Sequence, residues 1–162
     1  MKLLFLGRGN SSNINEGNTA AYFIENRHLF LIDCGESIFE RLIESGILES
    51  IEAINLMITH THSDHVGSLG SFIMYCYFNV KKKFHIILSK DAKHKETIQL
   101  LLKCYGCNEK MYDIVDEIDY DDHFLSFDTI RYFETKHVDY MSCYGILFKT
   151  KFISFFISLS KV

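Results

Sequence analysis

The sequence predicts an α/β protein in which a mixed β-sheet carries packed helices. One observation supports this fold class, and a second supports a single domain. Short segments with the composition of strands alternate along the chain with segments whose apolar residues recur at helical spacing. Such alternation is typical of sheets covered by helices. The chain also has 162 residues, 48% of them apolar and 23% charged, which is an ordinary composition for one globular domain. We therefore expect residues 1–162 to form a single domain.

Each expected element follows from a local pattern. Residues of strand type flank the polar pair Asn26-Arg27, which predicts a β-hairpin. Residues 91–104 have the periodicity of an amphipathic helix, and residues 71–78 are too apolar for a helix at the surface. The expected strands are residues 2–6, 20–25, 28–32, 51–59, 84–88, 111–115, 129–134 and 144–149, and the expected helices are residues 36–45, 66–78 and 91–104.

The pattern His60-x-His62-x-Asp64-His65 directly follows an apolar run and predicts a metal site. A strand that ends at Thr59 would direct His60 and His62 to one side, because side chains alternate along a strand. One ion can then take both imidazoles, and Asp64 and His65 face a neighbouring point where a second ion can bind. Nitrogen and carboxylate ligands without a cysteine suit zinc, with manganese or iron as alternatives. A surface cluster of histidines is the other interpretation, but packing gives no reason for this spacing.

This pattern resembles the signature of the metallo-β-lactamase superfamily of metal-dependent hydrolases. Upstream, Asp33-Cys34-Gly35-Glu36 is similar to the first motif of the ribonuclease Z and phosphodiesterase branch. The resemblance covers about residues 1–149. It implies an αββα sandwich, of which this chain would hold the N-terminal half and the start of the second half.

The resemblance also implies roles for individual residues. His137 follows a predicted strand and would complete His60 and His62 as a set of three nitrogen ligands, although it could instead be an isolated loop histidine. Asp33 would orient the metal-binding loop through hydrogen bonds. It could equally cap the helix expected at residues 36–45, and both interpretations can hold. Asp64 would bind metal and also orient or deprotonate the attacking water.

Other candidate residues favour structural roles. Cys104 and Cys107 match C-x-x-C, but no second pair completes a tetrahedral zinc site, so a turn at the intervening glycine is preferred. His85 lies in an expected strand and His94 on a helix that looks exposed, and we expect neither to bind metal. The run of lysines at residues 81–83 is interpreted as a solvated turn.

Composition and charge argue against several classes of protein: those that bind nucleic acid over a broad surface, those that span a membrane and those that are secreted. A formal net charge of −4 and a pI of 6.0 argue against a broad nucleic-acid surface. No apolar stretch reaches the ~18 to 20 residues of a membrane span. Five scattered cysteines without a secretory signal indicate reduced thiols in a cytoplasmic protein. The expected partners are a small phosphodiester substrate and a second copy of the chain in a homodimer, with no membrane and with nucleic-acid polymers disfavoured.

The family pattern stops near the end of the chain. Full members of the superfamily carry a glycine-aspartate motif that bridges two metals, and later a further histidine. Here Asp139 is the last carboxylate residue and His137 the last histidine, although residues 151–162 could still form the expected strand. A truncated product or a fragment has this appearance, which predicts impaired activity.

The expected function is metal-dependent hydrolysis of a phosphodiester. The D-C-G-E form favours phosphodiesters over lactams, lactones and thioesters. The negative charge and the lack of a basic arm favour a small substrate such as a cyclic nucleotide over transfer RNA. Two alternatives remain open: a ribonuclease Z-like nuclease that processes RNA, and a non-catalytic, metal-binding remnant of a hydrolase. The expected cofactor is Zn²⁺, as one or two ions, with Mn²⁺ or Fe²⁺ as alternatives.

Overall fold

The computed structural model describes residues 2–117, 127–150 and 154–158. The strands in this part of the chain are β1 (Leu4–Gly7), β2 (Ala20–Glu25), β3 (His28–Ile32), β4 (Ala53–Met57), β5 (Lys83–Leu88), β6 (Asp113–Asp116), β7 (Phe127–Thr135), β8 (Cys143–Thr150) and β9 (Ser154–Ile157). The helices are α1 (Ile38–Glu44), α2 (Ile47–Ser50), α3 (Ser63–Val66), α4 (Leu69–Tyr75), the π-helical turn η1 (Cys76–Val80) and α5 (Ala92–Cys104).

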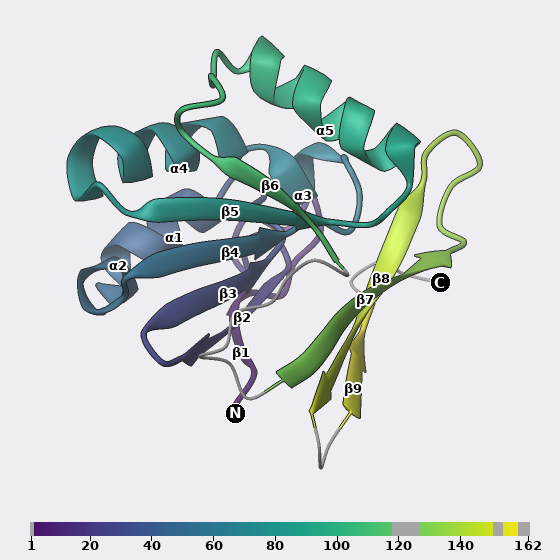
Figure 1. Cartoon of the computed structure of the whole chain (residues 1–162), viewed down its shortest axis with the longest axis horizontal. Coiled ribbons are helices and arrows are strands. Elements are labelled where there is room, and N and C mark those ends of the chain that lie inside the picture. Colours follow the sequence, from purple (N-terminus) through teal and green to yellow (C-terminus); the bar gives the residue numbers. More distant parts are fainter. Residues whose placement is uncertain (1, 118–126, 151–153, 159–162) are drawn as a thin grey trace.

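The strands form two sheets (Figure 1). The larger has six strands in the order β1-β2-β3-β4-β5-β6, and the smaller has three in the order β7-β8-β9. In the larger sheet β1, β2 and β3 are antiparallel neighbours, whereas β3, β4, β5 and β6 run parallel. The expected mixed α/β fold is therefore confirmed.

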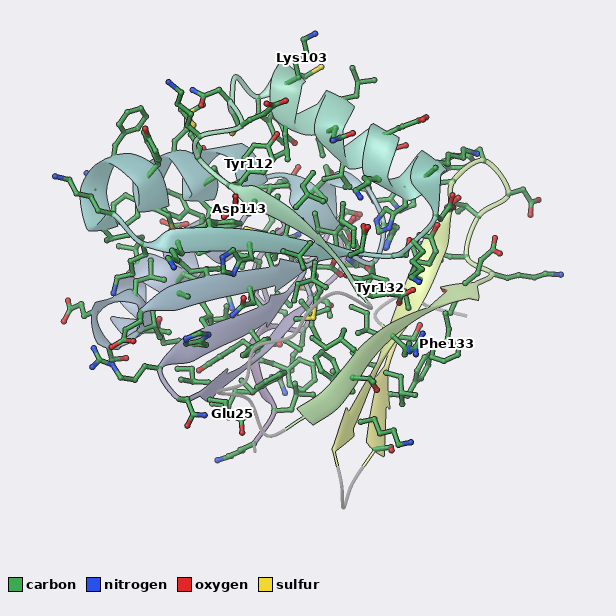
Figure 2. The ribbon with its side chains drawn as sticks, viewed as in Figure 1. Glu25, Lys103, Tyr112, Asp113, Tyr132 and Phe133 are labelled. Carbon is green, nitrogen blue, oxygen red and sulfur yellow. The ribbon has the colours of Figure 1, made fainter. Side chains whose placement is uncertain are left out.

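The larger sheet separates two apolar cores. Alternate residues of β3 point to opposite faces, so Leu29 and Leu31 contact the helices, whereas Phe30 and Ile32 contact the smaller sheet. The same alternation is seen in β7, where Tyr132 is buried and Phe133 is 47% exposed (Figure 2). The described residues thus form three layers: helices, the larger sheet and the smaller sheet. These are the layers that the family resemblance implied for half of an αββα sandwich and the start of the other half.

Most element bounds agree with the sequence to within a few residues. The hairpin of β2 and β3 has the predicted bounds, and its turn residues Asn26 and Arg27 adopt the positive φ angles, 47° and 66°, of a tight hairpin turn. The helix expected at residues 66–78 is instead divided between α3, α4 and η1. At its end Tyr77 and Phe78 are 39% and 61% exposed, so the expectation that residues 71–78 do not lie at the surface is wrong for these two.

Two segments toward the end of the chain are the acidic stretch, residues 113–128, and the tail, residues 151–162. A strand does form in the tail, as β9. The acidic composition of residues 113–128 predicts a solvated loop or edge, and its histidine, His123, lies outside the described residues. Within the described part of the chain, none of the helices is both long and apolar enough to cross a membrane.

Candidate metal centre

The predicted metal loop begins at the carboxyl end of the central strand β4. All five residues of β4 are buried, which is usual for a strand with parallel neighbours and both faces covered. The chain leaves the sheet after Met57, and α3 begins at Ser63, with His62 as its N-cap residue. The loop therefore lies at the edge where the parallel strands end, which is the usual position of sites in such sheets.

Three histidines meet at this edge. His60, His62 and His137 each offer a ligand atom, and these atoms lie within 4.8 Å of one another. His60 Nε2 and His62 Nδ1 are 3.1 Å apart. The His137 ring lies 5.1 Å from the His60 ring and 5.5 Å from the His62 ring, measured between centroids. Because His137 follows β7, the cluster joins the two sheets.

Asp33 anchors the loop from the end of the neighbouring strand β3. Its carboxylate accepts hydrogen bonds from the Thr59 backbone N–H at 2.7 Å, from the Thr59 hydroxyl at 2.6 Å and from His65 Nδ1 at 2.6 Å. The interpretation of Asp33 as a helix N-cap is wrong, because α1 begins at Ile38 with Ser37 as its N-cap residue. The carboxylate is instead occupied by the metal loop.

This network also determines which nitrogen of His60 carries a lone pair. The Thr59 hydroxyl donates its proton to Asp33, so at its 3.0 Å contact with His60 Nδ1 it must accept. Neutral His60 is then protonated at Nδ1, and its lone pair is on Nε2, the atom that faces His62. Proteins usually orient a metal-binding histidine by a hydrogen bond to its outer nitrogen, the ring nitrogen that does not bind the metal.

The protonation of the histidines follows from burial and charge. Burial, assisted by repulsion from His65, His62 and His137, lowers the pKa of His60 to about 3. His60 is therefore neutral at physiological pH, as a metal ligand must be. Burial also opposes the charged form of His65, but the adjacent carboxylates of Asp33 and Asp64 outweigh it and raise the pKa of His65.

Asp64 and His65 lie next to this cluster but are not part of it. His65 Nε2 is 3.7 Å from an Asp64 carboxylate oxygen, and the His65 ring centroid is 3.9 Å from that of His60. His65 Nδ1 is already bonded to Asp33. The two residues are thus beside each other as predicted, whereas their binding of a second ion stays a prediction.

Sequence reasoning missed two residues of the site. Thr59 links Asp33 to His60, and only the pairing of β3 with β4 brings it to Asp33. The Tyr140 hydroxyl lies 3.0 Å from His62 Nε2. No local pattern distinguishes Tyr140 from other exposed tyrosines, because its contact joins residues far apart in the chain.

The remaining candidates are elsewhere. His94 is 3% exposed, so the expectation of an exposed position is wrong: its ring stacks on Tyr144 at 4.5 Å and Nδ1 bonds the Ser89 hydroxyl at 2.9 Å. His85 Nδ1 lies 3.1 Å from the Asn55 side-chain oxygen. Neither belongs to the three-histidine cluster. Gly106 adopts a φ of 79° directly after α5, which supports a turn there.

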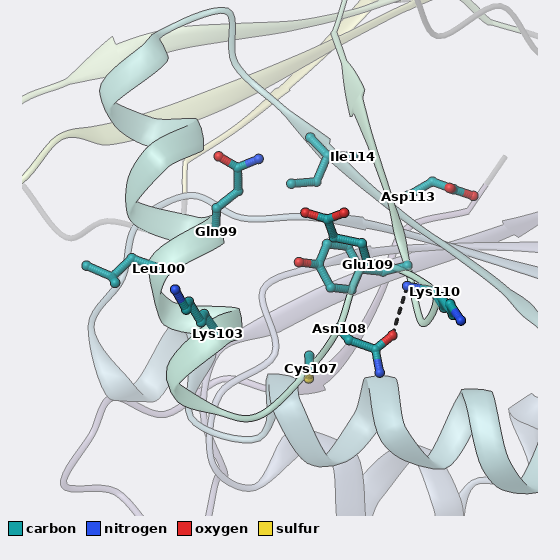
Figure 3. Close-up of a pocket in the computed structure, with 10 residues that line it drawn as sticks. Gln99, Leu100, Lys103, Cys107, Asn108, Glu109, Lys110, Asp113 and Ile114 are labelled. Atoms are coloured by element: carbon teal, nitrogen blue, oxygen red, sulfur yellow. Dashed lines mark hydrogen bonds between the residues drawn. The ribbon is translucent and has the colours of Figure 1, made fainter.

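Two hollows of the surface differ in volume and in whether a predicted site residue lines them. One of about 1070 Å³ lies between α5 and the turn before β6, where Lys103, Lys110 and Tyr112 contribute to its lining (Figure 3). None of the predicted site residues lines it. A hollow of about 400 Å³ has His137 in its wall together with Lys93 and Lys136. We place the candidate site beside the smaller hollow, because one of the three clustered histidines, His137, lines it.

Fold and site together define a protein of the metallo-β-lactamase fold. The structure is similar to the metallo-β-lactamase fold protein YhfI from Bacillus subtilis, with a TM-score of 0.69 and 18% identity over 94% of this chain and 59% of that chain. It is equally similar to the short form of human tRNase Z, with a TM-score of 0.69 and 18% identity over 98% of this chain and 68% of that chain.

Sequence comparison narrows the class to a family. The model of the family "Anti-Pycsar protein Apyc1" matches residues 1–158, and the chain therefore belongs to that family. The anti-Pycsar protein Apyc1 of Bacillus phage vB_BveM-Goe7 is 39% identical over 79 residues, which are 48% of this chain and 30% of the relative. Ribonuclease Z of Methanococcus aeolicus is 30% identical over 104 residues, 64% of this chain and 32% of the relative. The chain spans about a third of the length of these two relatives.

Proposed function

We propose that the protein is a metal-dependent phosphodiesterase that acts on a small phosphodiester such as a cyclic nucleotide. The observation that carries this proposal is the cluster of His60, His62 and His137 at the edge of the sheet. Membership of the anti-Pycsar protein Apyc1 family, whose members degrade cyclic nucleotides, supports the same reaction class.

The donor set fits a divalent metal, and we propose zinc. The three imidazoles are close enough to share one ion, burial keeps His60 neutral, and the lone pair of His60 Nε2 faces His62. Three nitrogen ligands with an open position are typical of catalytic zinc. An ion held there would polarise a phosphoryl oxygen and lower the pKa of water toward ~7. Mn²⁺ and Fe²⁺ are alternatives with the same ligand preference.

The protein groups around the cluster have separate roles in this proposal. Asp33 keeps the loop and the tautomers of its histidines in place, while Asp64 orients or deprotonates the attacking water. Asp64 and His65 supply half of a second metal site, so we expect an ion there to be bound weakly. Lys93 and Lys136 lie in the wall of the same hollow as His137, where Glu134 and Asp139 also lie, so each lysine can attract an anionic phosphate only locally.

A ribonuclease Z-like activity on RNA is the second candidate. The similarity to ribonuclease Z of Methanococcus aeolicus favours it. The net charge of −4 favours the small substrate, because proteins that follow a phosphate backbone usually carry an excess of positive charge. We retain the cyclic nucleotide as the first choice.

Metal loading and substrate choice together test the proposal. The purified chain is stripped of metal, titrated with Zn²⁺ or Mn²⁺, and assayed with a cyclic nucleotide, a bis-aryl phosphate, a precursor transfer RNA and a lactone. We expect about one tightly bound zinc per chain and hydrolysis of the cyclic nucleotide that rises with metal concentration. Asp64→Asn should retain the tight ion and lose turnover, whereas His60→Ala should lose the ion.

Results other than these would reject the proposal or favour one of the alternative functions. Turnover of the lactone alone would reject the phosphodiesterase. Turnover of transfer RNA alone would select the ribonuclease Z-like candidate. Bound zinc without hydrolysis of any substrate would identify a non-catalytic metal-binding domain, and His60→Ala with unchanged zinc content would remove the metal site itself.

A further inference from the structure

Tyr140 combines high exposure with a specific contact. Its side chain is 73% exposed, yet its hydroxyl lies 3.0 Å from His62 Nε2. An exposed tyrosine gains little from packing, so this hydrogen bond, and not burial, is what the residue adds at this position. The contact is to the outer nitrogen of a predicted ligand, which is where orienting partners of metal-binding histidines are found.

The loop that carries Tyr140 also carries His137, and it is attached to the metal loop at several points. The Thr61 hydroxyl donates to the Met141 sulfur at 3.6 Å, and the Tyr144 backbone N–H donates to the Thr59 carbonyl at 2.9 Å. Together with the bond between His62 and Tyr140, these contacts hold the loop of the smaller sheet against the loop of the larger one. Among the residues that the smaller sheet contributes to this set, Tyr140 is the one whose side chain contacts a histidine of the cluster.

The hydrogen bonds imply that the Tyr140 hydroxyl changes role when metal binds. With the proton of His60 on Nδ1, His60 Nε2 can only accept at its 3.1 Å contact with His62 Nδ1, which places the proton of neutral His62 on Nδ1. His62 Nε2 then has a lone pair and accepts a hydrogen bond from the Tyr140 hydroxyl. An ion held between His60 and His62 would take the lone pair of His62 Nδ1; the proton of His62 would then be on Nε2 and would be donated to the Tyr140 oxygen. A phenol hydroxyl can both donate and accept, and therefore fits both states.

We propose that Tyr140 is a positioning residue of the metal centre: its hydroxyl holds His62 with Nδ1 toward His60 in both tautomers, and so raises metal affinity. This inference rests on the proposed binding of metal by the three histidines and adds a residue to it. Phenylalanine at this position keeps the ring but removes the hydroxyl. Loss of such a partner commonly costs 10 to 100-fold in affinity. Because Tyr140 is exposed to competing water, we expect Tyr140→Phe to weaken zinc binding about 10-fold, at the lower end of that range.

The test measures zinc affinity by competition with a chromophoric chelator, independently of turnover. Tyr77→Phe is the matched control, because Tyr77 is a partly exposed tyrosine on η1, outside the cluster. Tyr140→Phe should weaken binding and the control should not. ¹⁵N spectra of imidazole-labelled protein should show His62 protonated at Nε2 in the zinc-loaded wild type, as the exchange of roles requires.

Kinetics separates positioning from contact with substrate. At saturating zinc, Tyr140→Phe should recover kcat and KM close to those of the control if Tyr140 acts through His62. A raised KM that persists at saturating zinc would replace this role by a direct contact with substrate. Equal zinc affinity in Tyr140→Phe and the control, or a His62 tautomer that is the same with and without zinc, would overturn the proposal. If the wild type binds zinc but hydrolyses nothing, the affinity and tautomer measurements still decide the role of Tyr140, whereas only the phosphodiesterase fails.

Discussion

Two features of Asp33 cost folding free energy, and the hydrogen bonds of the site compensate for one of them, the burial of its carboxylate. Its φ of 65° lies in the left-handed region, and its carboxylate is completely buried. Three donors from Thr59 and His65 satisfy the carboxylate. An unusual backbone conformation with a buried charge is typical of a residue retained for a site and not for packing. Asp33 thus connects the end of β3 to the loop after β4. Through the Thr59 hydroxyl it also determines which nitrogen of His60 is protonated.

His94 makes the stability of the fold depend on pH. Burial lowers the pKa of His94 to about 4, against the opposing charge of Asp91. In the unfolded chain the pKa is near ~6.5, so the unfolded state binds more protons between these values. The stability that neutral His94 contributes is therefore complete above about pH 6.5 and is lost as pH falls toward 4. The loss amounts to about 2–3 kcal/mol.

Urea unfolding of the wild type and of His94→Phe at several pH values from 7 to about 4.5 measures this contribution. Phenylalanine preserves a ring against Tyr144 but cannot be protonated. The free energy of unfolding of the variant should fall less steeply as pH is lowered, because other titrating groups are common to both proteins. Parallel pH profiles for the two proteins would show that His94 is not responsible.

The elements around the site are joined by backbone contacts that leave no room for side chains. The turn after β3 and the helix α3 are bonded to each other: the Cys34 N–H donates to the His65 carbonyl at 2.7 Å, and the Ser68 N–H donates to the Cys34 carbonyl at 3.2 Å. Gly35 lies between them, and a Cβ there would be 2.0 Å from the Asp64 carbonyl oxygen. Close approach of the two segments places Asp64 and His65 beside Asp33.

Gly35→Ala should therefore displace α3 and damage the site. A steric clash with backbone cannot be relieved by rotating a side chain, so we expect a loss of about 1–3 kcal/mol in the free energy of unfolding, together with weaker zinc binding. Gly46→Asn is the control, because Gly46 has a φ of 68° that asparagine tolerates and no atoms near its Cβ position. Denaturant unfolding and zinc titration of both variants provide the measurement. Unchanged stability in Gly35→Ala would mean that the two segments can separate at no cost.

In the whole molecule, the histidine cluster joins two layers that are also joined by apolar contacts and by hydrogen bonds, such as the one from the Tyr132 hydroxyl to the Ile87 carbonyl at 2.6 Å. Phe23 of the larger sheet meets Phe148 of the smaller sheet edge to face, with 5.3 Å between ring centroids. His60 and His62 come from the larger sheet, and His137 comes from the loop between β7 and β8. An ion shared by the three histidines would therefore fasten one sheet to the other.

Removal of metal should loosen the smaller sheet selectively. A ligand that binds only the folded state stabilises it by about 4 kcal/mol when its concentration is 1,000 times its Kd. We expect a chelator to accelerate amide hydrogen exchange in β7 and β8 more than in β3 and β4, as measured by mass spectrometry. His137→Ala should show fast exchange in β7 and β8 with or without zinc. Equal acceleration in both sheets would contradict a bridging role for the ion.

Patterns that are local in the chain were predictable. The hairpin of β2 and β3 followed from a polar turn between two strand-like runs, and the proximity of His60 and His62 followed from the alternation of side chains. The resemblance to metal-dependent hydrolases pointed to His137 and Asp33. The burial of His94 was not predictable, because its helix looks exposed until β7 and β8 cover that side.

The sequence by itself determined the α/β class, most strands and the candidate ligands of the H-x-H-x-D-H pattern, because these depend on spacing within short segments, whereas His137 became a candidate through the family resemblance. Only the tertiary structure decided how they cooperate. Asp33 reaches Thr59 because β3 and β4 pair in parallel with Ile32 opposite Met57, and Tyr140 reaches His62 because two sheets meet there. The direction of each hydrogen bond then determines which nitrogen is free to bind metal. Such contacts depend on strand order and packing between distant segments, and no periodicity along the chain encodes them.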